Sequence, residues 1–385
     1  MEQEIGRREL LKQGAAITGL AALASVTWPL PALAQGEELV PFTDAPDPLR
    51  TDPAKPGTTH ILDTRTVKDF YTSNDDFYVV QHYGQPELDA GAFRLRVSGL
   101  LDNPIELSLD DIKKRKRVEL DAGFECGGNQ KRLFYGLVGN AKWAGISLRD
   151  LLEECGIQQE GKEVVFFGAD EGEEEIRRTT VKQNFARSMS LEDALNSDCL
   201  LAYEMNGDPL PMMHGRPLRL VVPGWFGVAN VKWLTHIHIQ DDRYMGRFMA
   251  RDYVTLRRYE VGGVKRWTEE SVTRMNLMSV IVRVTRKADL YTIHGFSLND
   301  GTELKRIEVK IDDGPWKAAK IDHQSSKYSW KMFSSDWTDA KPGDHTIVSR
   351  AIDIQGNIQP EEAHIPEKVT YWENPGQFPR TIKIS

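Results

Sequence analysis

Short alternating segments separated by glycine- and proline-containing turns place the strongest limit on the fold of the C-terminal third. The segments are Val280–Val284, Ile307–Ile311 and Ile347–Ile352. The turns are Asp312–Pro315 and Lys341–Asp344. Regular short strands with such turns are typical of an antiparallel sandwich. We therefore predict an all-β, immunoglobulin-like domain over residues 269–385.

The preceding region, residues 61–268, mixes strands and helices. Phe93–Val97 alternates as a strand, and Ser147 suits the N-cap of a short helix. Asn206-Gly207 after an apolar run predicts a hairpin. The regular strand–helix alternation of a doubly wound sheet is missing from this sequence, so the predicted class is α+β.

The N-terminus has the features of an export signal. Arg7-Arg8 precedes a moderately apolar run that ends in Ala32-Leu33-Ala34. This pattern predicts a twin-arginine signal over residues 1–34, a periplasmic location, and no stable membrane anchor after cleavage. Residues 35–60 are rich in Pro, Asp and Thr, and we predict that they form an extended N-terminal arm. Export of folded protein suits a chain that carries a cofactor.

Composition excludes some partners. The 385-residue chain has a formal net charge of -8, which argues against nucleic acid and fits a basic soluble partner. It contains no C-x-x-C-H motif, so we expect no haem in this chain.

Cys126 is the candidate metal ligand among three cysteines. It follows an extended run and precedes Gly127-Gly128-Asn129, whose turn chemistry allows close approach of a bulky ligand. Cys155 and Cys199 lie in apolar contexts and are expected to be core residues.

Downstream basic residues predict an anion site. His214, Arg219 and Lys232 all lie beside strands that end in Gly/Pro turns. Arg and Lys donate charge-assisted hydrogen bonds to phosphate oxygens.

Together these motifs resemble the sulfite oxidase family of molybdenum enzymes. Cys126–Asn129 is similar to that family's C-x-G-N, Lys142–Gly145 to its R-W-x-G, and Ala202–Gly207 to its A-Y-x-M-N-G. The segments around His214 and Lys232 follow in the family's order. The C-terminal sandwich is similar to the family's dimerisation domain, so a homodimer is expected.

The resemblance implies one molybdenum–molybdopterin per chain in residues 61–268. Cys126 would bind the metal, and Tyr253 would lie beside it. The residues implied to hold the pterin and its phosphate are His82, Asp170, His214, Arg219, Asn230, Val231 and Lys232. Lys131 matches an anion-binding arginine near the metal cysteine and is assigned a catalytic role.

The implied reaction is oxygen-atom transfer to a small sulfur-containing substrate, first of all the oxidation of sulfite to sulfate. A periplasmic cytochrome c would accept the electrons. The pattern departs from sulfite-oxidising members at Val80 and Lys131, where the family has arginines. Lysine lacks the bidentate fork of arginine. A sulfane dehydrogenase acting on carrier-bound sulfur, or a related sulfoxide reductase, is therefore the alternative.

Two other classes of protein compete with this interpretation. His236 and His238 alternate on one strand, so they share a face and could bind zinc or copper. The second competing class is a non-catalytic exported binding module built on the sandwich. Such a module would need neither folded export nor an ordered cysteine and basic-residue set.

Overall fold

The computed structural model describes residues 33, 36–45, 59–196, 198–361, 368, 370 and 372–385. The predicted export signal lies outside them apart from Leu33, as does much of the predicted arm. Leu33–Ser385 forms one compact unit. No helix among the described residues is long and apolar enough to cross a membrane.

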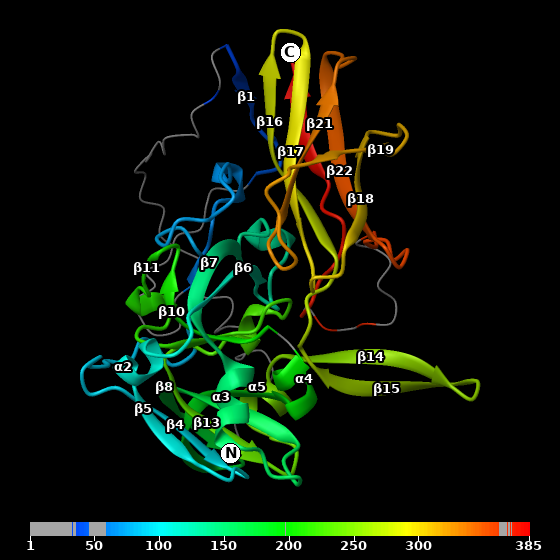
Figure 1. The fold of residues 1–385 in the computed structure, drawn as a ribbon. Helices are drawn as coiled ribbons and strands as arrows, with labels where there is room; N and C mark the ends of the chain where they lie inside the picture. The colour runs from blue at the N-terminus through cyan, green and yellow to red at the C-terminus, as the bar shows by residue number, and fades with distance from the viewer. Residues whose placement is uncertain are drawn as a thin grey trace, which may run out of the picture. The chain divides into compact units, whose positions relative to one another are not determined.

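A mixed sheet in the order β5-β4-β13-β8-β9 forms one part of the predicted α+β region (Figure 1). β13 runs parallel to β4, and the other pairs are antiparallel. Its strands are β4 (Arg94–Gly99), β5 (Ile105–Ser108), β8 (Glu163–Ile176), β9 (Thr179–Ser190) and β13 (Leu234–Gln240).

A second sheet, β11-β10-β7-β6 with β12 paired to β10, carries the cysteine loop. Asn206 and Gly207 both have positive φ, which confirms the predicted tight turn between β10 and β11. β6 ends at Glu125, so Cys126 is the first residue beyond it. The strands are β6 (Val118–Glu125), β7 (Val138–Ser147), β10 (Leu200–Met205), β11 (Asp208–Pro209) and β12 (Arg219–Val221).

Helices are short and cover the sheets. The predicted cap is confirmed, because the Ser147 hydroxyl accepts a hydrogen bond from the Asp150 backbone amide at 3.2 Å. The α-helices are α2 (Leu109–Lys113), α3 (Leu148–Cys155), α4 (Leu191–Asn196) and α5 (Arg247–Ala250). The 3-10 helices are η1 (Thr64–Thr66), η2 (Lys131–Leu133), η3 (Met212–His214) and η4 (Gly227–Ala229).

Two further pairs lie outside these sheets. β2 (Thr59–His60) pairs with β3 (Val79–Val80), and β14 (Val254–Val261) pairs with β15 (Val264–Ser271).

The predicted sandwich is present in the C-terminal third. One sheet has the order β1-β16-β17-β21-β20 and the other β19-β18-β22-β23. The first contains β1 (Glu38–Val40), β16 (Met278–Lys287), β17 (Leu290–Leu298), β20 (Lys320–Ile321) and β21 (Lys331–Trp337). The second contains β18 (Leu304–Ile311), β19 (Lys317–Ala318), β22 (Gly343–Asp353) and β23 (Arg380–Ile384). β1 comes from the predicted arm, which therefore joins the sandwich edge where it is described.

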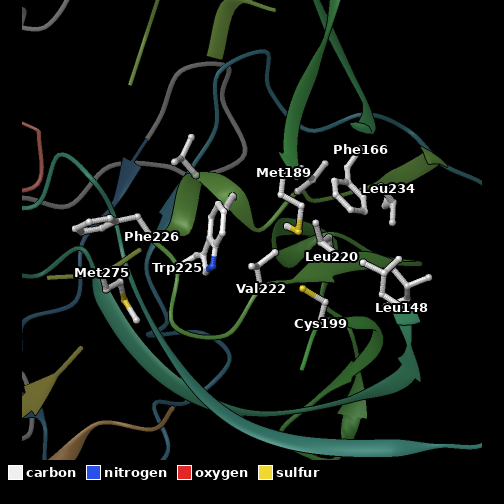
Figure 2. Packing of buried hydrophobic residues seen from close by; sticks show 14 of the residues in the cluster. Leu148, Phe166, Met189, Cys199, Leu220, Val222, Trp225, Phe226, Leu234 and Met275 are labelled. Atoms are coloured by element: carbon white, nitrogen blue, oxygen red, sulfur yellow. The ribbon is translucent and has the colours of Figure 1, made fainter. Parts of the chain in front are cut away.

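One apolar core runs from the mixed sheet into the first sandwich residues. Figure 2 shows Cys199 among Leu148, Leu220 and Val222, and Met275 beside Phe226 in the same cluster. Cys155 belongs to this cluster as well. The core assignment of these two cysteines is therefore confirmed.

Arg380 ties three segments together. Its side chain is fully buried, with the guanidinium carbon 3.6 Å from the Phe42 ring centroid and 3.7 Å from that of Phe134. Its Nε donates to Asp44 at 3.1 Å. A stacked, paired guanidinium of this kind holds the N-terminal segment, the cysteine-loop region and β23 in place.

We predict that Arg380→Ala lowers the free energy of unfolding by about 3 kcal/mol, because it opens a cavity and leaves Asp44 unpaired. Urea denaturation followed by fluorescence measures the change. Lys383→Ala, on an exposed position of the same strand, is the control and is expected to change stability by less than about 0.5 kcal/mol. Equal midpoints for both variants would contradict the assignment.

Candidate functional site

A pocket of about 630 Å³ opens at the end of β6. Segments far apart in the sequence contribute to it, including the β3 region, the cysteine loop, η4 and the residue that precedes β14. The site residues expected from the sequence that line it are His82, Cys126, Asp170, His214, Arg219, Asn230, Lys232 and Tyr253.

The cysteine loop fixes the position of Cys126. The Asn129 side chain accepts a hydrogen bond from the Leu137 amide at 3.0 Å and donates to the Tyr135 carbonyl at 3.3 Å. A Cβ at Gly127 would lie 3.1 Å from the Val272 side chain, so the loop passes close to the apolar core there. Burial raises the pKa of the Cys126 thiol to about 11. The thiolate form therefore requires a nearby positive centre such as a metal ion.

The carboxyl group of Glu125, the residue directly before Cys126, is protonated near neutral pH. Glu125 is buried, and this burial raises its pKa to about 8, opposed by a hydrogen bond from Asn129. A protonated carboxyl at neutral pH adds no negative charge next to the thiol.

Two cations, the buried Arg219 and the half-buried Lys232, face the pocket without a carboxylate ion pair among the described residues. Arg219 donates to the carbonyls of His214 at 3.0 Å and Asn230 at 3.1 Å, and its guanidinium carbon lies 4.8 Å from the Trp143 ring centroid. Burial lowers the pKa of Arg219 to about 10, so it stays charged at neutral pH.

Lys232 is the second cation. Its ammonium donates to the carbonyls of Val80 at 3.1 Å and Met213 at 3.2 Å. Burial lowers its pKa, while the neighbouring Asp170 raises it. Because burying a cation is costly and Asp170 acts on Lys232 alone, the two side chains together fit an anionic ligand.

Two buried polar side chains in the pocket have unsatisfied atoms. The Gln81 amide has no hydrogen-bond partner at either its nitrogen or its oxygen, and Asp170 has none at Oδ1. Burial raises the pKa of Asp170. Unpaired buried groups of this kind are rare and fit a ligand with both donors and acceptors, such as a heterocycle. Gln81 was missed from the sequence, although it precedes the assigned His82.

Two histidines are neutral in this site. Burial, with the charges of Arg247 and Lys232, lowers the pKa of His82 to about 3. Its Nε2 lies 3.0 Å from the Tyr253 hydroxyl. His214 is also buried, its pKa is lowered by burial to about 3, and its Nε2 lies 2.7 Å from the Asn74 carbonyl.

Two expected residues are not brought to the pocket. Lys131 is exposed at the start of η2, and its ammonium lies 5.9 Å from the Phe378 ring centroid. Lys131 does not line this pocket, because the turn after Asn129 directs it towards Phe378, and its catalytic role stays a prediction. Val231 is buried in the core instead of lining the pocket. Val80 does line it, so a residue without charge occupies that wall.

The histidine pair on β13 does share a face. The Ser98 hydroxyl lies 2.7 Å from His236 Nε2 and 3.1 Å from His238 Nδ1. Within the described part of the chain, no group of three or more His, Cys, Asp or Glu side chains is placed to hold a metal ion. The Ser98 hydroxyl thus lies within hydrogen-bond distance of both imidazoles, and the described residues place no third metal ligand beside them.

Comparison with protein families identifies two matching profiles. The profile for an oxidoreductase molybdopterin binding domain matches residues 82–248. The profile for a Mo-co oxidoreductase dimerisation domain matches residues 269–374.

Similar proteins include sulfite oxidases. The mitochondrial sulfite oxidase of Drosophila melanogaster is 30% identical over 330 residues, which cover 77% of this chain and 56% of the relative. The human mitochondrial sulfite oxidase is 27% identical over 364 residues, which cover 84% of this chain and 66% of the relative. The chain thus spans less than two thirds of the length of either protein.

A solved structure shares the fold. The sulfane dehydrogenase SoxCD from Paracoccus pantotrophus superposes with a TM-score of 0.73, covering 95% of this chain and 96% of that one. At 23% sequence identity, this similarity shows the fold alone.

We predict that His214→Gln flattens the pH dependence of stability in protein produced without a ligand in the pocket. Unfolded histidine binds a proton near pH 6.5 and folded His214 only near pH 3, so the wild type loses stability as the pH falls through this window. Removing one such group reduces the slope by about 1.4 kcal/mol per pH unit.

Urea midpoints between pH 6 and pH 4 measure this slope. His323→Gln, at an exposed position, serves as the control and leaves the slope as in the wild type. An unchanged slope in His214→Gln would show that His214 is not buried in its neutral form.

Proposed function

Because this chain belongs to the sulfite oxidase family of molybdopterin oxidoreductases, we propose that its pocket binds one molybdenum–molybdopterin and oxidises a small sulfur compound by oxygen-atom transfer. One observation carries the proposal. A buried thiol opens into the same pocket as two cations, Arg219 and Lys232, that hydrogen-bond only backbone carbonyls among the described residues. A soft metal bound to an anionic organic group satisfies both.

Each side chain then has a role. Cys126 binds the metal as a thiolate, since a metal cation offsets the burial that otherwise keeps the thiol protonated. Arg219 and Lys232 bind the phosphate of the pterin. Gln81 and Asp170 supply the unpaired donor and acceptor atoms for its heterocycle. When bound, such a cofactor supplies two-electron oxygen-atom-transfer chemistry.

Tyr253 and His82 form the polar pair at the substrate side. Because His82 is neutral, it accepts a hydrogen bond from the Tyr253 phenol or donates one to it. The pair therefore adds hydrogen-bonding capacity without adding charge. Tyr253 stacks on Trp372 at 4.2 Å between ring centroids, which holds the phenol in place.

Sulfite is the first substrate proposed, as the names of the relatives suggest. Its oxidation takes one water and yields sulfate, two protons and two electrons. The electrons would pass to a separate periplasmic cytochrome c. We further propose export by the twin-arginine route, a cofactor-binding domain over residues 61–268 and a dimerisation domain over residues 269–385.

Carrier-bound sulfane sulfur is the second candidate. Val80 gives the pocket wall no charge, and Lys131 lies away from it. A pocket with fewer cations suits a substrate that is not a free dianion. SoxCD, which shares the fold, is a sulfane dehydrogenase. A sulfoxide reduced in the opposite direction is a third substrate to test.

We predict that Cys126→Ser loses bound molybdenum and turnover together, because a hydroxyl replaces the soft thiolate ligand. Elemental analysis of purified protein gives the metal content per chain, and Cys155→Ala, at a buried core cysteine, is the matched control. Wild-type molybdenum content in Cys126→Ser would refute the ligand assignment. Stoichiometric zinc or copper in place of molybdenum in the wild type would refute the proposed cofactor.

We predict that Val80→Arg lowers the KM for sulfite about tenfold, since one added ion pair in a partly buried site contributes about 1.4 kcal/mol. Val80→Gln, similar in polarity but uncharged, separates charge from size. Steady-state assays with cytochrome c as acceptor compare sulfite, thiosulfate and, with a reductant, methionine sulfoxide. A wild-type enzyme that turns over only thiosulfate or the sulfoxide would overturn sulfite as the substrate.

A further inference from the structure

One carboxylate on the outer part of β8 joins the segments that carry His82 and Tyr253. This outer part, Glu171–Ile176, extends past the last residue of β8 that pairs with β13. Glu174 lies on it, and its side chain is only 9% exposed. We call this carboxylate and the side chains linked to it by hydrogen bonds the Glu174 network. Its other members are Tyr83, Arg247, Arg251 and Asp252.

Arg247 bridges two carboxylates within this network. Its Nη1 donates to Glu174 at 2.6 Å, and its Nε donates to Asp252 at 2.7 Å. The Tyr83 phenol donates to the same Glu174 oxygen as Arg247, and Arg251 donates to the other oxygen at 3.2 Å. The planar fork of arginine suits such a bridge, whereas the ammonium of lysine is a point charge on a flexible stem.

The network reaches both members of the polar pair through their neighbours along the chain. Tyr83 directly follows His82, and Asp252 directly precedes Tyr253. The network therefore joins two segments whose pair members are 171 positions apart in the sequence. The 3.0 Å separation of the Tyr253 hydroxyl and His82 Nε2 depends on where these two segments are held.

Close packing couples the network to His82 as well. A Cβ at Gly172 would overlap the Tyr83 ring, so β8 lies against that ring only because residue 172 is glycine. The Phe248 ring centroid lies 5.7 Å from that of Tyr83 and 4.7 Å from that of His82. A displacement of Tyr83 thus reaches His82 by contact and along the chain.

The backbone at Tyr253 needs support from its surroundings. Its φ is 57°, in the left-handed region that side chains other than glycine rarely adopt. Arg247 holds the preceding residue twice, because the Asp252 amide donates to the Arg247 carbonyl at 2.8 Å and the Asp252 carboxylate accepts from Arg247 Nε. This double contact fixes the turn from which the phenol projects.

We propose that Glu174 and Arg247 are positioning residues that hold the His82 imidazole and the Tyr253 phenol at hydrogen-bond distance. Neither Glu174 nor Arg247 lines the pocket, whereas both members of the pair do, so the two residues act through their neighbours. The effect on turnover rests on the proposed function, but the position of the pair does not.

A purely electrostatic role for Arg247 is the competing explanation. Burial lowers the pKa of His82, the charges of Arg247 and Lys232 lower it further, and Glu174 opposes them. Arg247→Lys keeps the positive charge but removes the fork that bridges the two carboxylates. Gly172→Ala changes no charge but displaces the Tyr83 ring. Both variants therefore test position separately from charge.

NMR of the full purified chain, labelled with carbon-13 at histidine, tests the geometry. The His82 Cε1–H resonance is identified by its absence from His82→Gln. Arg247→Lys and Gly172→Ala are each expected to shift or broaden it, because the contact with the Tyr253 phenol changes. A His82 resonance that stays at its wild-type position in Arg247→Lys would overturn the proposal. Circular dichroism verifies folding, and Arg247→Lys alone decides the outcome if Gly172→Ala does not fold.

Glu308→Gln is the matched control for Glu174→Gln. Glu308 lies on β18, its side chain is 11% exposed, and it accepts from Arg306 at 2.6 Å and Arg350 at 2.8 Å. The control therefore removes a carboxylate with a similar environment, and it is expected to leave the His82 resonance and kcat as in the wild type. An equal loss of kcat in both glutamine variants would show a general structural effect and refute the positioning role.

Steady-state kinetics with sulfite provide the second readout. Glu174→Gln and Arg247→Lys are each expected to lower kcat about tenfold while KM stays within about threefold, because a misplaced hydrogen-bonding pair affects the transition state more than binding. The double variant is expected to match the weaker single variant, since both changes break one bridge. Wild-type kcat in Arg247→Lys would contradict the proposal. Because NMR needs no substrate, absence of sulfite turnover in the wild type would count against the proposed function alone.

Discussion

Buried positive charge is the constraint on which the site depends. Arg219, which is buried, and Lys232, which is half-buried, line the pocket and are held by backbone carbonyls from η3, the loop after η4 and the β3 region. Carbonyl dipoles reduce the cost of burying a cation but do not neutralise it. The fold therefore keeps two cations in one pocket, an arrangement that would suit an anionic group. The same field contributes to keeping His82 neutral.

The thiol and the cations are brought together by different parts of the fold. β6 ends at the cysteine and Asn129 fixes the loop, whereas the cations come from the segments on either side of η4. Trp372 and Glu373, beyond the sandwich strand β22, close the same region through Tyr253 and Gly127. The C-terminal segment thus packs directly behind the pocket, against Tyr253 and the cysteine loop.

Patterns among residues close together in the chain explain which parts of the fold could be predicted from the sequence. The sandwich strands, the Ser147 cap and the Asn206-Gly207 turn follow from short-range patterns, and the structure contains all of them. Most of the candidate site was predictable because ordered motifs carried it. Lys131 was not, since its direction depends on how the turn after Asn129 packs against Phe378. The edge pairing of β1 was also missed, because a Pro- and Asp-rich stretch has no pattern that specifies a partner strand.

The sequence alone determined the strand and turn pattern, the position of the cysteine loop and the identity of the basic residues, because each depends on neighbours along the chain. The tertiary structure alone decided which polar groups are buried without partners. Gln81 is an ordinary glutamine in sequence, and only the packing around it leaves its amide unpaired inside the pocket. The apolar side chains of the β14–β15 hairpin look like those of any strand, and only the fold leaves several of them exposed. Burial is a property of long-range contacts, so the sequence alone does not specify it.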